Sequence, residues 1–304
     1  MTAGRIVTVR GELAPEALGF TLSHEHTAIA LWHIPGRWDY WELTRDEEVI
    51  VPELTSYREA GGTCLVDLTP PGVGRDPLWL RRLSELTDLH IVMGCGWYRG
   101  AYYPIEALID RRSVDSLADE LVREFEVGVG ETGVRPGIIG EIGTDKPWLS
   151  ATEERVHRAS ARAARRTGMA ITTHAVMSDV GLAQLRVFEE EGADLSRVVI
   201  GHADSYPRLE HYLAIIERGA SLEFDFLGMR FTPTERHGED RLVRGEPGGQ
   251  VHALKQDGLV GDAGRRRAEA SNEAAGRADM DQGAARRLLE VQIVGEVARI
   301  VAEA

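Results

Sequence analysis

The sequence predicts an α/β protein whose parallel strands close into a (β/α)8 (TIM) barrel, with an atypical segment at about 241–287. Three observations support this fold class. Apolar, β-rich runs alternate with amphipathic helical stretches through most of the chain. The runs are apolar enough to be buried on both faces, as strands of parallel sheets are. Several runs end in histidine or another polar residue, and barrel enzymes build their sites at the carboxyl ends of strands.

Length and composition describe a globular protein, long enough for one large domain or two ordinary ones. The chain has 304 residues, of which 43% are hydrophobic and 28% charged. We expect a single barrel domain over residues 1–304, since no linker or internal repeat interrupts the pattern. No apolar run reaches the length of a membrane span, and residues 1–10 lack the apolar core of a secretory signal. We therefore expect a cytoplasmic protein without a membrane partner.

Charge and cysteine content exclude further classes. The formal net charge of −14 disfavours nucleic acid and other polyanions as partners. Two cysteines, Cys64 and Cys95, rule out a disulfide framework. Both lie in apolar runs typical of core strands, and cysteine is among the most buried residue types. We therefore interpret both as reduced core residues rather than catalytic thiols.

The first half of the chain predicts three strands and three helices. A short apolar run leads into His24-Glu25-His26, and the helical stretch after it stops at Gly61-Gly62. The next β-rich run is closed by Pro70-Pro71, and Tyr103-Pro104 opens a long helical region. The expected strands are 20–26, 63–69 and 90–94, and the expected helices are 45–60, 76–89 and 103–125.

The second half continues the alternation of strands and helices. Glu141 lies inside the fourth strand, and an acidic start at Thr152-Glu153-Glu154 leads a basic, alanine-rich helix. The expected strands are 137–143, 169–174, 197–202 and 220–225, and the expected helices are 152–168, 178–191 and 207–218. Seven buried strands separated by helices predict a parallel sheet.

The pattern fails after about residue 241. Gly, Ala, Arg and acidic residues dominate 241–287, which we interpret as diverged and poorly ordered sequence. The expected eighth strand has no run of Val, Ile or Leu, and its nearest candidate, residues 251–257, is a poor one. Residues 288–304 have helical apolar spacing and predict a closing helix.

His24 and His26 are the first candidate metal ligands. Residues i and i+2 of a strand point to the same face, so the two imidazoles would lie side by side at the strand's end. Such a pair is suited to one divalent ion. Two unrelated polar histidines on a loop are the alternative for so short a motif.

Three further strands carry ligand-type residues, namely Glu141, His174 and His202. Each alone could be an ordinary hydrogen-bonded residue or, for Glu141, half of a buried pair with an arginine. A buried carboxylate is costly without a positive partner, and a metal ion supplies one. Four histidines and one glutamate at equivalent strand positions therefore predict a metal centre.

Five ligands exceed the needs of one catalytic zinc ion, so we expect two divalent ions, most simply zinc. His24 and His26 would bind one ion, His174 and His202 the other, and Glu141 would bridge them. A hydroxide held between the ions would attack an ester carbonyl or a phosphorus centre. These ligands do not tell zinc from manganese, iron or cobalt. The remaining histidines are interpreted as structural: His33, His90, His157, His211, His237 and His252.

Several segments, in their order along the chain, resemble a known family. They are Thr8–Gly11, Gly19–His26, Gly94–Tyr98, Gly137–Thr144, Ile171–His174, Ile200–Asp204 and Phe224–Asp225. Together they are similar to the phosphotriesterase-related family of the amidohydrolase superfamily, in its lactonase-like branch. The resemblance implies a (β/α)8 barrel, a binuclear and usually zinc centre, and hydrolase activity.

The resemblance also implies roles for single residues. It places the two histidines of the first strand on one metal and the two later histidines on the other. Glu141 stands where many members carry a carboxylated lysine. Asp257 weakly matches a strand-eight aspartate that binds a metal and accepts a proton from the bridging water. Tyr98 matches a tyrosine near the substrate carbonyl in lactone-cleaving relatives, with simple loop packing as the alternative. Asp204 is interpreted either as a carboxylate that orients His202 or as a helix N-cap.

Three hypotheses of function follow. The first is a metal-dependent hydrolase of a small apolar ester or lactone, with phosphotriesters as further substrates. The second is a TatD-type nuclease, because Gly140–Asp145 resembles that family too, although the net negative charge weighs against it. The third is a barrel that binds metal or a small molecule without turnover, motivated by the weak eighth strand. A homodimer is the default assembly.

Overall fold

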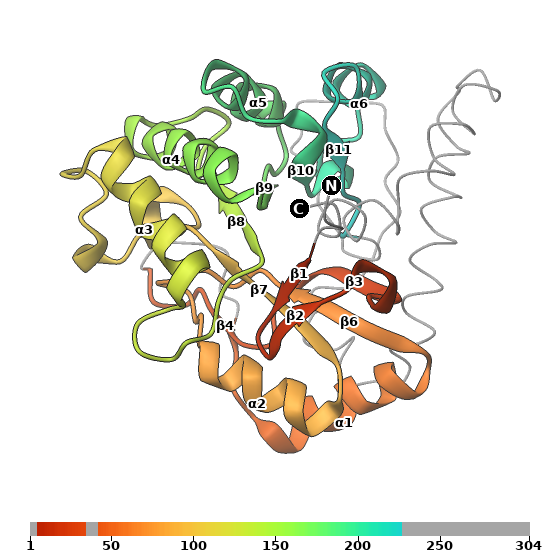
Figure 1. The fold of residues 1–304 in the computed structure, drawn as a ribbon. Helices are drawn as coiled ribbons and strands as arrows, with labels where there is room; N and C mark the ends of the chain where they lie inside the picture. Colours follow the sequence, from red (N-terminus) through yellow and green to blue (C-terminus); the bar gives the residue numbers. More distant parts are fainter. Residues whose placement is uncertain (1–4, 35–41, 227–304) are drawn as a thin grey trace.

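One curled sheet of seven parallel strands organises the residues that the computed structural model describes, 5–34 and 42–226. Its order is β11-β10-β9-β8-β7-β6-β3, so each strand pairs with the next one along the chain, and the strands follow an arc (Figure 1). The strands are β3 (Phe20–Glu25), β6 (Gly62–Asp67), β7 (His90–Cys95), β8 (Ile138–Gly143), β9 (Ala170–His174), β10 (Val198–Gly201) and β11 (Ser221–Leu222). This arrangement confirms the predicted α/β barrel architecture over the described residues.

Helices cover the outer side of the arc (Figure 1). They are α1 (Glu47–Glu59), α2 (Pro77–Thr87), α3 (Val114–Val127), α4 (Ala151–Thr167), α5 (Val180–Glu190) and α6 (Leu209–Ile216). Local signals set their ends. Ser150 and Glu153 form a reciprocal capping box at the start of α4, and Gly168 ends that helix in the left-handed region with φ of 79°. Asp76 caps α2 by accepting hydrogen bonds from two backbone N–H groups of its first turn.

One predicted helix is shorter than expected. The sequence predicted helix over 103–125, but the structure has only a 3-10 turn at Ile105–Ala107 before α3 begins at Val114. Leu108 has φ of 49°, a left-handed conformation that interrupts any right-handed helix. Ser113 then caps α3 by accepting a hydrogen bond from the backbone N–H of Ser116. Turn chemistry between the two segments therefore overrides their helical periodicity.

Apolar side chains are buried on both faces of the sheet, which explains the apolar strand sequences. Ile138 packs in the cluster inside the arc, whereas Ile139 packs between the sheet and the helices. Cys64 and Cys95 divide between these two layers in the same way, and both are free thiols. Burial raises the pKa of Cys64 to about 12. The prediction that both cysteines are reduced core residues is confirmed.

A β-hairpin that the sequence did not predict covers the amino end of the sheet. It consists of β1 (Ile6–Thr8) and β2 (Gly11–Leu13), and the backbone N–H of Val9 donates to the carbonyl of Ile91 in β7 at 2.9 Å. A second small ladder pairs β4 (Ile29–Ala30) with β5 (Glu42–Leu43). Among the described helices, none combines the length and apolarity needed to span a bilayer. The predicted segments 241–287 and 288–304 lie outside the described residues.

Candidate metal centre

The five predicted ligand residues meet at the carboxyl ends of the strands, around Glu141. Its Oε2 lies 2.8 Å from Nδ1 of His174 and 3.1 Å from Nε2 of His202. Nε2 of His24 lies 3.5 Å from the same oxygen, and Nε2 of His26 lies 3.6 Å from Oε1. The Glu141 side chain is 2% exposed, so four imidazoles surround one buried carboxylate.

The strands place these side chains because their carboxyl ends meet at one edge of the sheet. His24 and Glu141 belong to β3 and β8, and His174 is the last residue of β9. His202 follows β10 with φ of 57°, a left-handed conformation that costs free energy in a non-glycine residue and is concentrated at functional sites. Close packing also requires Gly143, because a Cβ there would lie 2.6 Å from Cβ of His174.

The ligand atoms form three overlapping groups, two of which contain Glu141, while the third consists of His24, His202 and Asp225. Those of His24, His26 and Glu141 lie within 4.8 Å of one another, and so do those of Glu141, His174 and His202. Glu141 is common to these two groups of predicted ligands. This is the partition that the sequence predicted for two ions with a bridging glutamate, and ion binding itself stays a prediction.

The donor set fits divalent ions. Nε2 of His24 is buried and has no hydrogen-bond partner among the described residues, although it faces Glu141. In three histidines, Nε2 faces Glu141 and the opposite ring nitrogen, Nδ1, contacts another side chain. The Nδ1 atoms contact Thr69 Oγ1 (His26, 3.0 Å), Glu223 Oε2 (His24, 3.2 Å) and Asp225 Oδ1 (His202, 2.7 Å). Glu223 and Asp225 can only accept, so they favour hydrogen on Nδ1 of His24 and His202 and leave Nε2 of these rings to ligate, which is the usual arrangement around a metal. The hydroxyl of Thr69 can donate or accept, so it orients the ring of His26 in either tautomer.

Charge inside the cluster shifts the pKa of each member. Burial would raise the pKa of Glu141, but His174 and His24 hold it well below its usual range. Burial would lower the pKa of His24, but Glu141 and Asp225 raise it well above its usual range. Against the same burial, Asp225 raises the pKa of His202 to about 9. Burial dominates at His174, where it lowers the pKa to about 3. Burial also lowers the pKa of His26. The carboxylates therefore favour positive charge at His24 and His202, whereas burial disfavours it at His26 and His174.

Two carboxylates of the site were missed by the sequence analysis. Asp225, rather than Asp204, contacts Nδ1 of His202. Asp204 instead accepts a hydrogen bond from the backbone N–H of Phe226 at 2.9 Å, and it does not cap α6, whose N-cap is Arg208. Glu223 accepts from Ser23 Oγ at 2.6 Å. The available signal was the alternation Glu223-Phe224-Asp225, which places both carboxylates on one face of an extended segment.

Tyr98 lies beside the cluster and Asp257 lies outside the described residues. The hydroxyl of Tyr98 is 3.4 Å from Nδ1 of His174, and the Tyr98 side chain is buried. The guanidinium of Arg99 lies 4.5 Å from the centre of the Tyr98 ring. Tyr98 is thus close enough to act on a substrate bound at the cluster, but a catalytic role stays a prediction.

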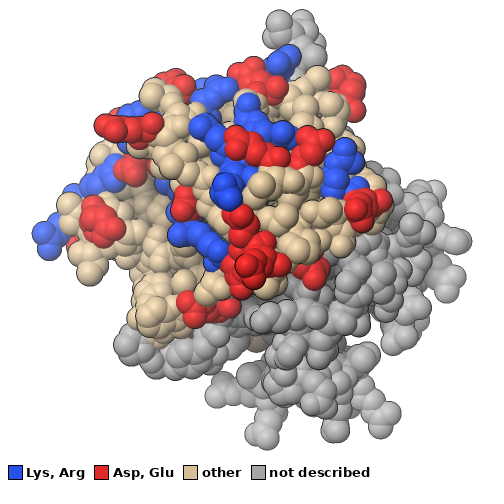
Figure 2. All heavy atoms as spheres, turned by 90° about the horizontal axis from the view of Figure 1, so that it is seen from below, with Lys and Arg blue, Asp and Glu red and all other residues tan. Residues whose placement is uncertain are grey.

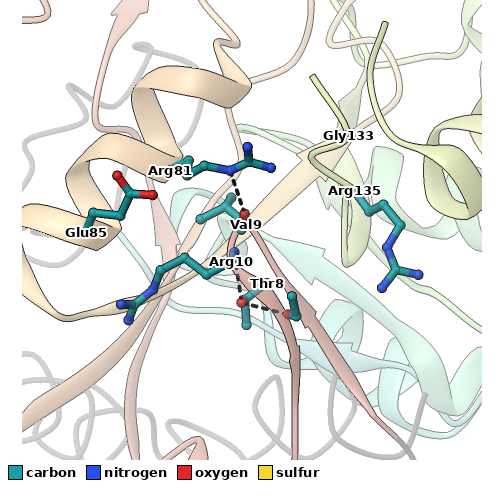
Figure 3. A pocket seen from close by; sticks show the side chains of 8 residues that line it. Thr8, Val9, Arg10, Arg81, Glu85, Gly133 and Arg135 are labelled. Atoms are coloured by element: carbon teal, nitrogen blue, oxygen red, sulfur yellow. Dashed lines mark hydrogen bonds between the residues drawn. The ribbon is translucent and has the colours of Figure 1, made fainter. Parts of the chain in front are cut away.

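A second concave site, at the amino end of the sheet, has a different character. It is a cavity of about 480 Å³ lined by Thr8, Val9, Arg10, Gly11, Arg81, Glu85, Gly133 and Arg135. In Figure 3 the arginines Arg10, Arg81 and Arg135 extend in different directions. Arg81 Nε donates to the carbonyl of Val9, and Arg135 donates to Glu12 at 3.0 Å. These arginines are therefore used by neighbouring protein groups and do not converge on a ligand.

Comparison with known proteins agrees with this geometry. Phosphotriesterase homology protein of Escherichia coli (strain K12) is 33% identical over 247 residues, which cover 80% of this chain and 78% of the relative. Phosphotriesterase homology protein of Mycobacterium tuberculosis is 36% identical over 234 residues, covering 73% and 70%. N-acetyltaurine hydrolase of Homo sapiens is 32% identical over 256 residues, covering 74% and 72%.

Solved structures and a family profile extend the match to the fold. The Escherichia coli phosphotriesterase homology protein, complexed with phosphate in its active site, superposes with a TM-score of 0.65 at 34% identity, covering 70% of this chain and 72% of that one. A resiniferatoxin-binding protein from Rhodobacter sphaeroides has a TM-score of 0.67 at 34% identity, covering 75% and 71%. The profile of the phosphotriesterase family matches residues 4–260. With the strand order, the ligand cluster and these relatives in agreement, this chain is a hydrolase that belongs to the phosphotriesterase family.

Proposed function

We propose that this chain binds two divalent ions, zinc in the first instance, and cleaves a carboxylic ester or lactone, with phosphoesters as further substrates. One observation carries the proposal, namely four imidazole nitrogens within 3.6 Å of the two oxygens of buried Glu141. Without ions, so many donors around one carboxylate leave Nε2 of His24 without a hydrogen bond. Bound there, the ions would lower the pKa of a shared water molecule and polarise the carbonyl oxygen of the substrate.

The protein residues supply binding, charge and orientation. Glu141 contributes the negative charge that both ion positions share, because both groups of predicted ligands include it. Thr69 holds the ring of His26 through Nδ1, so its Nε2 faces the site. The hydroxyl of Tyr98 lies 3.4 Å from Nδ1 of His174, which supports our assignment of Tyr98 as a hydrogen-bond donor to a substrate oxygen bound beside that histidine. We keep Asp257 as the proposed proton acceptor, on the family resemblance alone.

A second candidate substrate is an amide. Several relatives of this chain, including those of Homo sapiens and Dictyostelium discoideum, are N-acetyltaurine hydrolases. An acetyl amide offers the same carbonyl carbon to a nucleophile as an ester does, but its leaving group must gain a proton. A small N-acetylated amine is therefore the alternative to an ester or lactone for this chain.

Family membership and surface charge disfavour the nuclease hypothesis. On the face in Figure 2, acidic and basic side chains are interspersed rather than gathered by sign. Independently of that view, Arg158 of α4 pairs with Glu154, Glu190 and Glu191. The described residues on that face form no continuous basic surface of the kind that a nucleic-acid backbone needs.

The test is a substrate panel with one zinc-loaded preparation. It contains a lactone, a carboxylic ester, N-acetyltaurine, a phosphotriester and single-stranded DNA, each assayed before and after chelation. We expect chelator-sensitive cleavage of at least one carbonyl substrate and no cleavage of DNA. A fully zinc-loaded protein that cleaves none of them would favour a binding protein without turnover.

Tyr98→Phe tests the proposed hydrogen bond to the substrate. It removes one hydroxyl and keeps the ring that packs against Tyr102, whose centroid lies 5.5 Å away. We expect a fall in kcat of about 10²-fold with zinc content unchanged, as is typical when one such donor is lost. An unchanged kcat would leave Tyr98 as a packing residue.

A further inference from the structure

The segment after β11 contacts two predicted ligands, His24 and His202, at their Nδ1 atoms. Asp225 Oδ1 accepts a hydrogen bond from Nδ1 of His202 at 2.7 Å, and Asp225 Oδ2 lies 2.9 Å from Nδ1 of His24. The opposite nitrogens of these two rings lie 3.1 and 3.5 Å from Glu141. One carboxylate therefore contacts a histidine from each half of the predicted centre, on the side away from Glu141.

We propose that Asp225 is a positioning residue that favours hydrogen on Nδ1 of His202 through a hydrogen bond and on Nδ1 of His24 through its nearby charge, and thereby tunes both metal sites at once. This inference rests on the proposed function, since it requires ions at the site. A carboxylate that accepts from the far nitrogen of a ligating histidine fixes the ring and raises its basicity. Such carboxylates usually serve one ligand each. Here a single carboxylate serves ligands of two ions.

Glu223 provides a matched comparison, because its contacts are on the His24 side. Its Oε2 accepts from Nδ1 of His24 at 3.2 Å, and its Oε1 accepts from Ser23 Oγ at 2.6 Å. The hydrogen bond from Nδ1 of His24 goes to Glu223, whereas Asp225 Oδ2 makes no hydrogen bond among the described residues and contacts the same nitrogen through its charge, at 2.9 Å. In His202, by contrast, Nδ1 donates its hydrogen to Asp225 alone among these two carboxylates. Removing the charge of Glu223 should therefore affect one ion, and removing that of Asp225 should affect both.

The position of Asp225 is fixed by the next residue. The ring of Phe226 stacks on His202, with centroids 4.0 Å apart and planes at 6°. The backbone N–H of Phe226 donates to Asp204 Oδ2 at 2.9 Å. The side chain of Asp225 is 10% exposed, and hydrogen bonds to an ionised carboxylate are strong where water is largely excluded. The carboxylate is therefore held where it contacts both rings.

The first test titrates zinc into metal-free wild-type, Asp225→Asn and Glu223→Gln proteins against a competing chelator, so that both binding steps are resolved. We expect Asp225→Asn to weaken both steps by about 10- to 100-fold, and Glu223→Gln to weaken one step and leave the other unchanged. The inference is wrong if Asp225→Asn weakens one step only, or neither. Wild-type protein that binds no zinc would instead contradict the proposed function itself.

The second test needs no variant and so remains decisive even if Asp225→Asn does not fold. In cobalt(II)-substituted wild-type protein, a histidine ligated through Nε2 keeps a hydrogen on Nδ1, which a buried carboxylate protects from exchange. We expect hyperfine-shifted, slowly exchanging N–H resonances from both His24 and His202, and faster exchange of both in folded Asp225→Asn. His24, His202 and Asp225 also offer ligand atoms within 4.8 Å of one another. If either resonance is missing in wild-type protein, that ring keeps no protected hydrogen on Nδ1, and the positioning role is wrong.

Discussion

The two ends of the sheet both carry clusters of charged side chains, but only one end buries them. At the carboxyl end, Glu141 is 2% exposed and its imidazole partners come from three other strands or their ends. At the amino end, Arg135 and Glu12 form an ion pair whose side chains are 28% and 42% exposed. The hydrogen bond from Arg135 lowers the pKa of Glu12, and water solvates both partners.

This difference shows which charged cluster requires a ligand. Exposed ion pairs contribute little free energy and need no further partner. A buried carboxylate among imidazoles is costly to assemble, and it persists only where hydrogen bonds or an ion compensate for the lost hydration. The carboxyl end therefore predicts strong effects of mutation on metal content, and the amino end predicts weak ones.

We expect the largest effect on metal content from Glu141→Gln. If this variant kept its metal, the contrast between the buried cluster at the carboxyl end and the exposed cluster at the amino end would be wrong. The substitution keeps the shape and removes the charge shared by both groups of predicted ligands. Removing one partner of a buried ionic contact costs about 3–5 kcal/mol, equivalent to a loss of about 10²- to 4 × 10³-fold in affinity. Zinc content by mass spectrometry and hydrolysis of the panel substrates measure the result. Glu85→Gln in the amino-end cavity is the control and should retain both.

Removal of metal should also destabilise the fold. A ligand that binds only the folded state, at a free concentration of about 1,000 times its Kd, adds about 4 kcal/mol to the free energy of unfolding. We expect the unfolding temperature to fall on chelation and to recover when zinc is restored. Equal unfolding temperatures with and without zinc would contradict tight binding to the folded protein.

His157 sharpens the comparison, because it is buried in α4 with no metal cluster around it. It lies against Phe188, and its Nδ1 donates to the carbonyl of Glu153 at 2.8 Å. Burial lowers the pKa of His157 to about 4, against about 6.5 in an unfolded chain. As the pH falls, the unfolded chain takes up this proton first. The contribution to stability is therefore complete above pH 6.5 and is lost progressively down to pH 4, by about 3 kcal/mol in all.

Urea unfolding of wild-type and His157→Gln proteins between pH 7 and pH 4 measures this pH-dependent contribution of His157 to the free energy of unfolding. The variant has no proton to take up at this position, so its stability should fall less steeply over the interval. Parallel loss in the two proteins would show that other groups account for the pH dependence.

The smallest effect is expected at the amino end. Arg135→Ala removes the exposed contact with Glu12. We expect zinc content and turnover to stay at wild-type levels, with a shift in unfolding midpoint smaller than any effect above. A loss of zinc or activity would mean that the cavity in Figure 3 communicates with the metal cluster, and the contrast between the two ends would fail.

Much of the fold was predictable, because strand sequences buried on both faces are rich in β-branched and other apolar residues. The same logic predicted that His174 and His202 would meet Glu141, since the carboxyl ends of successive parallel strands lie together. Their assignment as ligands stays a prediction. The interruption at Leu108 was not predictable, because a left-handed leucine has no sequence signature comparable to that of glycine.

The carboxylates behind the rings were harder to identify. Asp204 and Asp225 both lie near His202, and only coordinates show that Asp225 reaches Nδ1 while Asp204 bonds the backbone of Phe226. Sequence periodicity gives the face of a strand but no distances across the barrel. Asp257 and the segment 241–287 lie outside the described residues, so their predicted roles remain untested.

The order of strands in the sheet has a consequence for how the protein becomes active. Ser23 and Glu223 are 200 positions apart, and their side chains bond across the barrel mouth. Contacts between residues so far apart in the sequence form late in folding, because the entropic cost of closing a long loop must be overcome first. During synthesis, all four imidazoles and Glu141 leave the ribosome before Asp225 does. Under the proposed function, the site would then become competent for metal only after the segment that carries Glu223 and Asp225 has been made and has docked, so zinc uptake would report that docking step.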